Sequence, residues 1–134
     1  MKQPFFSIIT VAYRDAWAAS KTARSVFRQS FDDFEYIFVD GNSQDGTAAL
    51  VEFWREQSLI DKAVIEPDRG VYDAMNKGID IASGRYVCFM NAGDVFASDS
   101  VLRRAHEILT SSELDGCLGW GELNGQIWAS WCPS

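Results

Sequence analysis

The chain has 134 residues, 47% of them hydrophobic and 23% charged, which predicts one folded domain spanning residues 1–134. The formal net charge of −7 argues against a nucleic-acid partner, because phosphate backbones select basic surfaces. The three cysteines include no CxxC pair, which argues against a zinc site or a disulfide framework and favours the reducing cytoplasm. No apolar stretch approaches the roughly 20 residues that a membrane-spanning helix needs.

Strands and helices are expected to alternate from the start of the chain. Residues 5–13 form a nearly continuous apolar, β-branched run, which is typical of a strand buried on both faces. Asp15 is expected to cap a helix over residues 16–29, where apolar residues recur at helical spacing. A second strand is expected over 34–40, followed by a turn cluster and a helix over about 47–57.

The same alternation continues through the middle of the chain. A short strand over 63–66 precedes a helix over 71–81, and a strand over 86–91 precedes a helix over 98–109. Residues 123–127 contain an Asn-Gly pair that favours a β-hairpin. Alternating strands and helices predict an α/β fold with a mostly parallel sheet and right-handed crossovers.

Acidic residues follow three of the expected strands. Asp40, Asp68 and Asp94 each come within about three residues of a strand's end, where open α/β sheets bind their ligands. One such acid is more simply a turn residue, but three at one edge favour a binding site. Asp94 could hold a divalent ion that bridges two phosphates, and Gly93 would let the backbone approach them.

Residues 67–78 form a second polar cluster at the mouth of a helix, whose N-terminus favours anions. Asp73 and Lys77 are four residues apart, so a helix-surface ion pair explains Asp73, whereas the role of Lys77 stays open. The chain has no P-loop, dinucleotide fingerprint or G-x-S-x-G elbow. His106, the only histidine, is expected to be structural or at the surface.

Several ordered motifs resemble those of family 2 glycosyltransferases. They lie at residues 7–13, 36–47, 66–79 and 89–94, within a resemblance that covers roughly residues 5–105. The last two motifs are similar to those of a bacterial branch that builds surface polysaccharides, such as colanic-acid-type enzymes. The resemblance implies a GT-A-type (Rossmann-like) α/β fold, of which this chain would hold the nucleotide-sugar-binding half without the acceptor-binding part.

The resemblance also implies roles for particular residues. Val11 and Tyr13 would hold the base, with Tyr13 packing against it, and Asp40 would contact the base or the ribose. Asp68 would line the nucleotide site, and Asp94 would contact the diphosphate and a Mg²⁺ or Mn²⁺ ion. The full set of expected donor-binding residues is Val11, Tyr13, Asp40, Asp68, Asn76, Lys77, Asn91 and Asp94.

The chain departs from the family pattern at three positions. The usual pair of acids after the second strand is Asp40-Gly41, so one carboxylate is missing. Met75 stands where many relatives have arginine, and Arg69 or Lys77 would have to replace that phosphate partner. The metal-binding motif begins with Asn91, which cannot supply its first carboxylate.

The resemblance predicts transfer of a sugar from a UDP- or GDP-sugar to a saccharide or lipid-linked acceptor, with inversion and with help from a metal ion. The base that activates the acceptor is not assigned to any residue of the chain. The reaction is expected in the cytoplasm, and the resemblance is compatible with peripheral association at the inner membrane. Trp120, Trp128 and Trp131 suggest an apolar surface for self-association.

Three other classes of protein remain as alternatives. A non-catalytic module of the same fold would bind nucleotide or a partner chain without turnover. A sugar nucleotidyltransferase would need a glycine-rich, arginine-bearing loop after the first strand, where residues 12–16 read Ala-Tyr-Arg-Asp-Ala. A phospho-receiver domain would need paired acids after the first strand and a lysine on the fifth, and neither is evident.

Overall fold

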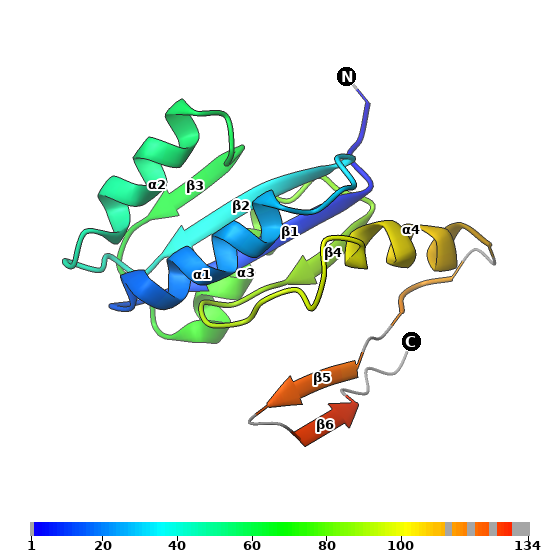
Figure 1. The fold of residues 1–134 in the computed structure, drawn as a ribbon. Coiled ribbons are helices and arrows are strands. Elements are labelled where there is room, and N and C mark those ends of the chain that lie inside the picture. Colours follow the sequence, from blue (N-terminus) through cyan, green and yellow to red (C-terminus); the bar gives the residue numbers. More distant parts are fainter. Residues whose placement is uncertain (1, 112–113, 118–119, 124–125, 130–134) are drawn as a thin grey trace.

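The computed structural model describes residues 2–111, 114–117, 120–123 and 126–129. Four parallel strands form a sheet in the order β3-β2-β1-β4, and a separate antiparallel pair, β5-β6, follows (Figure 1). The strands are β1 (Phe6–Ala12), β2 (Phe34–Asp40), β3 (Lys62–Ile65), β4 (Tyr86–Phe89), β5 (Trp120–Leu123) and β6 (Gln126–Ala129). The helices are α1 (Ala16–Phe27), α2 (Thr47–Glu56), α3 (Val71–Ile81) and α4 (Val101–Ser111).

The two central strands run in register along their whole length. Phe6 pairs with Phe34 at one end and Ala12 with Asp40 at the other, so β1 and β2 end at the same edge. Every residue of β1 is buried, as its continuous apolar sequence predicted. The predicted parallel α/β sheet is therefore confirmed.

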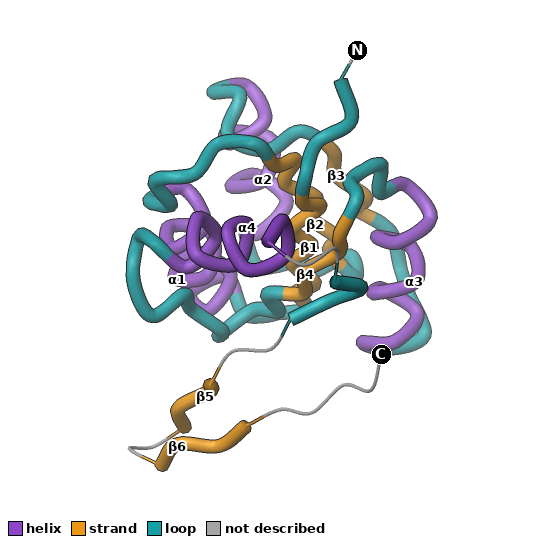
Figure 2. The backbone as a smooth tube through the Cα atoms, turned by 90° about the vertical axis from the view of Figure 1, so that its right-hand side faces the viewer, coloured by secondary structure: helices purple, strands orange, loops and turns teal. Residues whose placement is uncertain are grey.

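The helices cover both faces of the sheet. Helices α1, α2 and α4 lie on one face and α3 on the other (Figure 2). Helix α3 approaches the sheet closely at Gly78, where a Cβ would stand 2.6 Å from Cγ2 of Ile9. The core on the α3 face is made of Ile9, Val11, Ile37, Val39 and Ala74.

Most predicted helix and strand boundaries agree with the structure to within one residue, but four details were wrong. Helix α1 ends at Phe27 and strand β4 at Phe89, each two residues before the predicted end. Helix α4 begins at Val101 rather than at residue 98, because Ser98 forms a turn in which its hydroxyl accepts a hydrogen bond from the Ser100 amide. Phe53, expected on the apolar face of α2, is 54% exposed.

Several predictions concern the segment after α4, which the structure describes in part. The predicted pairing of two strands is present, since β5 and β6 pair antiparallel with Leu123 opposite Gln126. The side chains of Trp120, Trp128 and Trp131, expected to mediate self-association, lie outside the described part of the chain. Within that part, no helix is long and apolar enough to cross a membrane.

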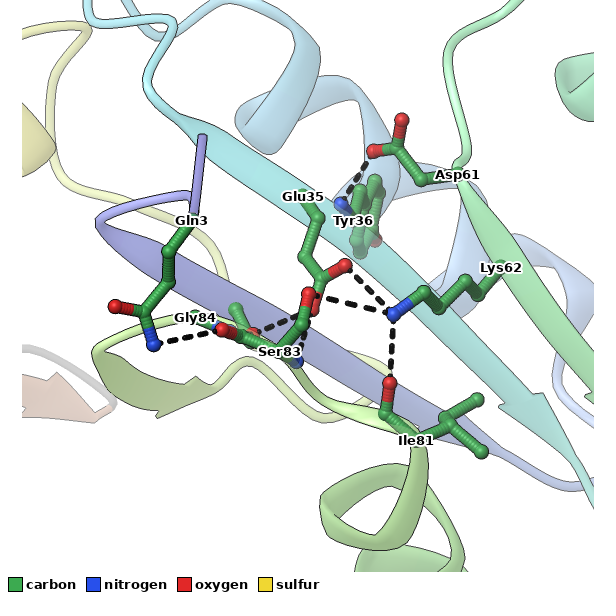
Figure 3. A network of polar contacts seen from close by, with 9 residues as sticks. Gln3, Glu35, Tyr36, Asp61, Lys62, Ile81, Ser83 and Gly84 are labelled. Atoms are coloured by element: carbon green, nitrogen blue, oxygen red, sulfur yellow. Dashed lines mark hydrogen bonds and ion pairs between the residues drawn. The ribbon is translucent and has the colours of Figure 1, made fainter. Parts of the chain in front are cut away.

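A polar network centred on Glu35 ties the amino ends of β1, β2 and β3 to the segment before β4 (Figure 3). The Glu35 carboxylate accepts hydrogen bonds from the Ser7 hydroxyl (2.7 Å) and the Ser83 amide (2.6 Å), and it pairs with the Lys62 ammonium (2.9 Å). Burial on its own would raise the pKa of Glu35. The hydrogen bonds from Ser83, Ser7 and Lys62 outweigh burial and lower the pKa to about 2.

Candidate functional site

The carboxyl edge of the sheet gathers most of the predicted site residues, whereas Asn76 lies in the middle of α3. Because the four strands are parallel, the segments that follow Ala12, Asp40, Ile65 and Phe89 all leave the sheet at this edge. The end of β1 and the turn after β4 are joined directly, since the Ala92 amide donates to the carbonyl of Val11 (3.0 Å). The edge can therefore present groups from all four strands to one ligand.

Val11 contributes to this edge through its backbone. Its side chain is buried in the core on the α3 face, and its carbonyl is occupied by the Ala92 amide. Tyr13, two residues further on, is 55% exposed. Its ring is the first flat side-chain surface after β1 that a ligand could reach. The guanidinium of Arg14 lies 5.0 Å from the centroid of the Tyr13 ring, in cation–π range.

Asp40 is fully buried, and its carboxylate is already hydrogen-bonded within the chain. Oδ2 accepts from the Ser43 amide (2.8 Å), and Oδ1 accepts from the Ser43 hydroxyl (2.7 Å). The Ser43 hydroxyl oxygen in turn accepts from the Arg14 amide (2.6 Å). Asp40 thus fixes the loop after β2 against the loop after β1, while its expected contact with a base or ribose stays a prediction.

Asp68 lies over Gly41, beside Tyr13. A Cβ on Gly41 would stand 2.7 Å from Asp68 Oδ2 and 3.1 Å from Tyr13 Cδ2. Asp68 Oδ1 accepts from the Gly70 amide (3.0 Å), which orients the carboxylate at the start of α3. The structure therefore brings an exposed aromatic ring and a carboxylate together over a residue without a side chain.

The segment from Asn91 to Asp94 forms a tight turn after β4. The Asp94 amide donates to the Asn91 carbonyl (2.8 Å), and Gly93 has a φ of 104°, which favours glycine. The hydroxyl of Thr22, on α1, accepts from the Gly93 amide (2.9 Å) and fixes the turn. Asp94 is consequently held in an exposed position just beyond the sheet.

The oxygen ligands in this turn suit a hard divalent cation. Asp94 carries an exposed carboxylate, and Oδ1 of Asn91 is a buried acceptor without a donor among the residues that the structure describes. Mg²⁺-type sites often combine one or two protein oxygens with substrate phosphates and water. Among the described residues, no group of three or more His, Cys, Asp or Glu side chains could hold a metal ion.

The two cations near the start of α3, Lys77 and Arg69, differ in how accessible they are to an anionic ligand. The Lys77 ammonium donates to the carbonyl of Pro67 (2.8 Å) and pairs with Glu66 (3.0 Å), so it braces this loop. The predicted pair of Lys77 with Asp73 is present at 3.9 Å. The Arg69 side chain is 91% exposed and lies 3.7 Å from Asp73, which leaves its guanidinium accessible to an anion.

The carboxylate of Asp73 organises the entry to α3. It accepts from the Arg69 amide (2.9 Å), and this hydrogen bond, with smaller contributions from Lys77 and Arg69, lowers the pKa of Asp73. Asn76, also expected at the donor site, is exposed on α3. A hollow of about 420 Å³ lies elsewhere, between the end of α1 and the loop before α4, and its lining contains none of the predicted site residues.

Comparison with known proteins places the chain in a family. The sequence model described as glycosyl transferase family 2 matches residues 7–130. The chain belongs to this family. A relative, a PGL/p-HBAD biosynthesis glycosyltransferase of Mycobacterium tuberculosis, is 36% identical over 108 residues. That match covers 78% of this chain and 42% of the relative, so the chain spans about two fifths of the relative's length.

Solved structures share the fold of this family 2 chain. TarS from S. aureus, in complex with UDP-GlcNAc, matches with a TM-score of 0.73 at 23% identity, over 81% of this chain and 32% of TarS. The mannosyltransferase PcManGT from Pyrobaculum calidifontis, in complex with GDP-Man and Mn²⁺, matches with a TM-score of 0.71 at 24% identity, over 81% and 33% of the two chains. The expected GT-A-type α/β fold is therefore confirmed.

Several residues that shape the site are not readily recognised from the sequence pattern. Gly41 reads in the sequence as a missing acid, but its role in admitting Asp68 depends on the spatial approach of two loops. Ser43 lies in the predicted turn cluster, where a Ser three residues after a strand-ending Asp was a usable signal. Thr22 gave no signal, because it reads as an ordinary helix residue until the turn at Gly93 is in place.

Proposed function

We propose that this chain binds the nucleotide-diphospho-sugar donor of a glycosyl transfer reaction at the carboxyl edge of its sheet. The observation that carries the proposal is the meeting of the Tyr13 ring and the Asp68 carboxylate over Gly41, in a chain of glycosyl transferase family 2. An aromatic ring beside a carboxylate offers a stacking surface and a hydrogen-bond acceptor, which together suit a nucleobase. The exposed Asp94 lies at the same edge, on the side of β4.

The donor is a UDP- or GDP-sugar in this proposal. Support comes from TarS and PcManGT, which share the fold and are described in complex with UDP-GlcNAc and with GDP-Man and Mn²⁺. Asp94 and Oδ1 of Asn91 would hold a Mg²⁺ or Mn²⁺ ion. When bound, such an ion neutralises the charge that develops on the leaving diphosphate. Arg69, whose side chain is 91% exposed beside Asp73, is proposed to meet a phosphate.

The proposed reaction inverts the anomeric carbon. A hydroxyl of a saccharide or lipid-linked acceptor attacks that carbon from the face opposite the diphosphate. The new glycosidic C–O bond forms as the bond to the diphosphate oxygen breaks, and the hydroxyl proton passes to a base. No residue of this chain is assigned as that base, so the role of the described edge is to bind and orient the donor.

The setting proposed for this reaction is the biosynthesis of a surface polysaccharide in the cytoplasm. The support is the similarity of residues 66–79 and 89–94 to the polysaccharide-building branch of the family. Free cysteines at positions 88 and 117 are compatible with a reducing compartment. Association with the inner membrane and with a second copy of the chain belong to the same proposal.

Calorimetric titration of UDP, GDP and their sugars, with and without Mn²⁺, tests the proposal. One nucleotide class should bind, and Asp94→Ala should weaken the Mn²⁺-dependent binding at least tenfold. Asp80→Ala, which removes another exposed carboxylate from α3, is the matched control and should bind like the unchanged chain. Failure of every nucleotide to bind would contradict the donor site, and binding that ignores both Mn²⁺ and Asp94→Ala would contradict the metal site.

A further inference from the structure

Helix α1 exposes a single row of side chains to solvent. The exposed residues of the helix are Trp17, Lys21 and Arg24, and its C-cap, Arg28, is exposed as well. These positions are spaced by four, three and four residues, so the side chains line one face of the helix. The row runs for about 16 Å, from the rise of roughly 1.5 Å per residue. It faces away from the sheet, against which α1 buries its opposite side (Figure 1).

The three cations of this α1 row have no carboxylate partner. None of them forms an ion pair within the part of the chain that the structure describes, whereas four cations elsewhere do, namely Arg55, Lys62, Arg69 and Lys77. Residues 16–27 include no acid. The chain as a whole has a net charge of −7, so the row is opposite in sign to the rest of the surface. Such a segregated positive row is the electrostatic pattern of a surface that binds anions.

The acids near the two ends of the row do not neutralise it. At the start of α1, Asp15 accepts a hydrogen bond from the Ala18 amide (3.0 Å) and Asp45 accepts one from the Ala16 amide (3.3 Å). These two carboxylates therefore compensate the amino terminus of the helix itself. At the other end, Asp99 lines the same hollow as Arg28 but forms no ion pair with it. The row stays available to an external anion.

Trp17 indicates which kind of anion the row fits. It is 73% exposed and lies in the first turn of the helix, in line with the cations. A tryptophan ring settles at the headgroup level of a bilayer, and nearby Lys and Arg side chains are attracted to anionic lipids. Nucleic acid, another common polyanion, is disfavoured by the net charge of −7. An exposed tryptophan aligned with three cations therefore favours a lipid surface.

We propose that the α1 row docks the chain on an anionic lipid bilayer. The ring of Trp17 enters the headgroup layer, and Lys21, Arg24 and Arg28 lie against the lipid phosphates. Each cation near an anionic membrane surface strengthens binding by about fivefold, and the contribution falls off within a Debye length. The three cations together therefore supply about 100-fold, and the tryptophan adds an apolar contribution that salt does not screen.

The bilayer surface adjoins the proposed donor edge. A Cβ on Gly93 would stand 4.0 Å from Cβ of Ala18, so the first turn of α1 packs beside the turn that carries Asp94. Docking through the row thus brings the donor edge near the headgroups, where a lipid-linked acceptor presents its hydroxyl. This choice of a lipid-linked acceptor over a free saccharide rests on the proposed donor-binding function, whereas contact with the bilayer does not require a nucleotide.

Binding to vesicles tests the proposal. Vesicles of phosphatidylcholine alone are compared with vesicles of phosphatidylcholine and phosphatidylglycerol in equal parts, by co-sedimentation with the unchanged chain. The anionic vesicles should bind at least about tenfold more tightly, and high salt should remove most of this preference. Combining Lys21→Gln, Arg24→Gln and Arg28→Gln should weaken binding to the anionic vesicles by about 10- to 100-fold.

A matched control separates the row from the net charge of the chain. Lys2→Gln, Arg55→Gln and Arg85→Gln together remove three exposed cations outside α1 and give the same net charge as the α1 triple variant. This control should bind the anionic vesicles within about threefold of the unchanged chain, because its cations lie away from the docked face. Equal losses in the two triple variants would overturn the role of α1.

Trp17 has a readout of its own. Trp17→Ala should weaken binding to the anionic vesicles by about 3- to 10-fold. Tyr72→Ala removes a 79% exposed ring from α3, on the other side of the sheet, and should leave vesicle binding unchanged. Brominated lipid tails should quench the tryptophan fluorescence of the unchanged chain, and the quenching should be smaller in Trp17→Phe. Quenching that is the same in both would overturn the placement of Trp17 in the headgroup layer.

The remaining outcomes distinguish the bilayer from other partners and from the donor site. Absence of binding to the anionic vesicles would overturn the proposal, and so would binding to soluble polyglutamate that needs the three cations but not Trp17, since the partner would then be an acidic macromolecule. In calorimetry without vesicles, the α1 triple variant should bind nucleotide like the unchanged chain. If the unchanged chain binds vesicles but no nucleotide, the donor function and the inference about its acceptor fail, and the bilayer surface stands.

Discussion

The side-chain amide of Asn91 lies 3.9 Å from the sulfur of Met75. The resemblance to family 2 glycosyltransferases implies an arginine in many relatives where Met75 stands, and an acid at the start of the expected metal-binding motif where Asn91 stands. The two departures are thus in contact. Neither residue is charged: Met75 supplies no cation and Asn91 supplies no carboxylate. This half-buried position therefore holds no unpaired charge from the two side chains.

The contact predicts that charges at these two positions are coupled. Asn91→Asp should lower the free energy of unfolding by about 1–3 kcal/mol, because it places a carboxylate in a half-buried position against a thioether. The same change should strengthen Mn²⁺ binding, because it adds a second hard anionic ligand near Asp94. Thermal unfolding and a Mn²⁺ titration measure the two effects.

Adding Met75→Arg should recover the stability that Asn91→Asp loses. A double-mutant cycle should then give a favourable coupling free energy of about 0.5–3 kcal/mol. Asn76→Asp, on the exposed neighbouring position of α3, is the control and should neither destabilise the chain strongly nor couple to Met75→Arg. Strictly additive effects of Met75→Arg and Asn91→Asp would contradict the coupling.

The depressed pKa of Glu35 predicts how stability depends on pH. Its pKa is about 2 in the fold against an ordinary value of 4.5, so the fold favours the ionised carboxylate. This contribution is complete above about pH 4.5 and is lost as the pH falls towards 2. Glu35→Gln should lower the free energy of unfolding by about 2 kcal/mol at pH 7. The difference from the unchanged chain should shrink progressively below pH 4.5.

Glu52→Gln provides the matched control for Glu35→Gln. The Glu52 side chain is 54% exposed and pairs with Arg55 three residues away on α2, so its removal should change stability by less than about 0.5 kcal/mol. Denaturant unfolding at several pH values between 2.5 and 7 makes the comparison. A Glu35→Gln effect that is the same at both ends of this range would refute the assignment.

Gly84 makes the closest backbone approach next to this network. A Cβ there would stand 2.6 Å from the Ser7 amide nitrogen and 2.7 Å from the Phe6 carbonyl carbon. Backbone atoms of a central strand cannot move aside as a flexible side chain can, so Gly84→Ala should destabilise the chain by about 2–3 kcal/mol. Gly116→Ala, where a Cβ would meet nothing within 4 Å, should be nearly neutral in the same denaturant titration.

The sequence was sufficient to predict the fold, because the apolar runs and turn residues indicate the same alternation of strands and helices that the parallel sheet requires. The strand over 34–40 and the helix over 71–81 have the predicted bounds, since buried apolar runs are bounded by clear turn residues. The start of α4 was not predictable from capping residues alone. Asp99 and Ser98 both satisfy capping preferences, but their carbonyls accept from Ser30 and Gln29, which belong to a distant part of the chain.

The sequence predicted where the site lies, but not which of its acids is buried in a structural contact and which is available to a ligand. Parallel strands place Asp40, Asp68 and Asp94 at one edge, and the sequence pattern indicates this directly. The burial of Asp40 depends on the Ser43 hydroxyl folding back onto it, and the position of Asp68 depends on the empty space at Gly41. Both are contacts across loops, which periodicity and spacing do not encode.

Asp40→Asn distinguishes a structural role of this acid from direct contact with the nucleotide. The substitution keeps the shape of the side chain but replaces one acceptor oxygen with an amide that faces the donors of Ser43. If Asp40 only fixes the loop, the free energy of unfolding should fall by about 1–3 kcal/mol. Nucleotide affinity, measured by calorimetry at a temperature where the variant is folded, should then stay within about twofold of the unchanged chain.

Ser43→Ala should show the same pattern, because it removes the partner hydroxyl without touching a ligand-facing group. A tenfold or larger loss of affinity in Asp40→Asn alone, with Ser43→Ala binding normally, would instead show that Asp40 contacts the base or ribose as the family resemblance implies.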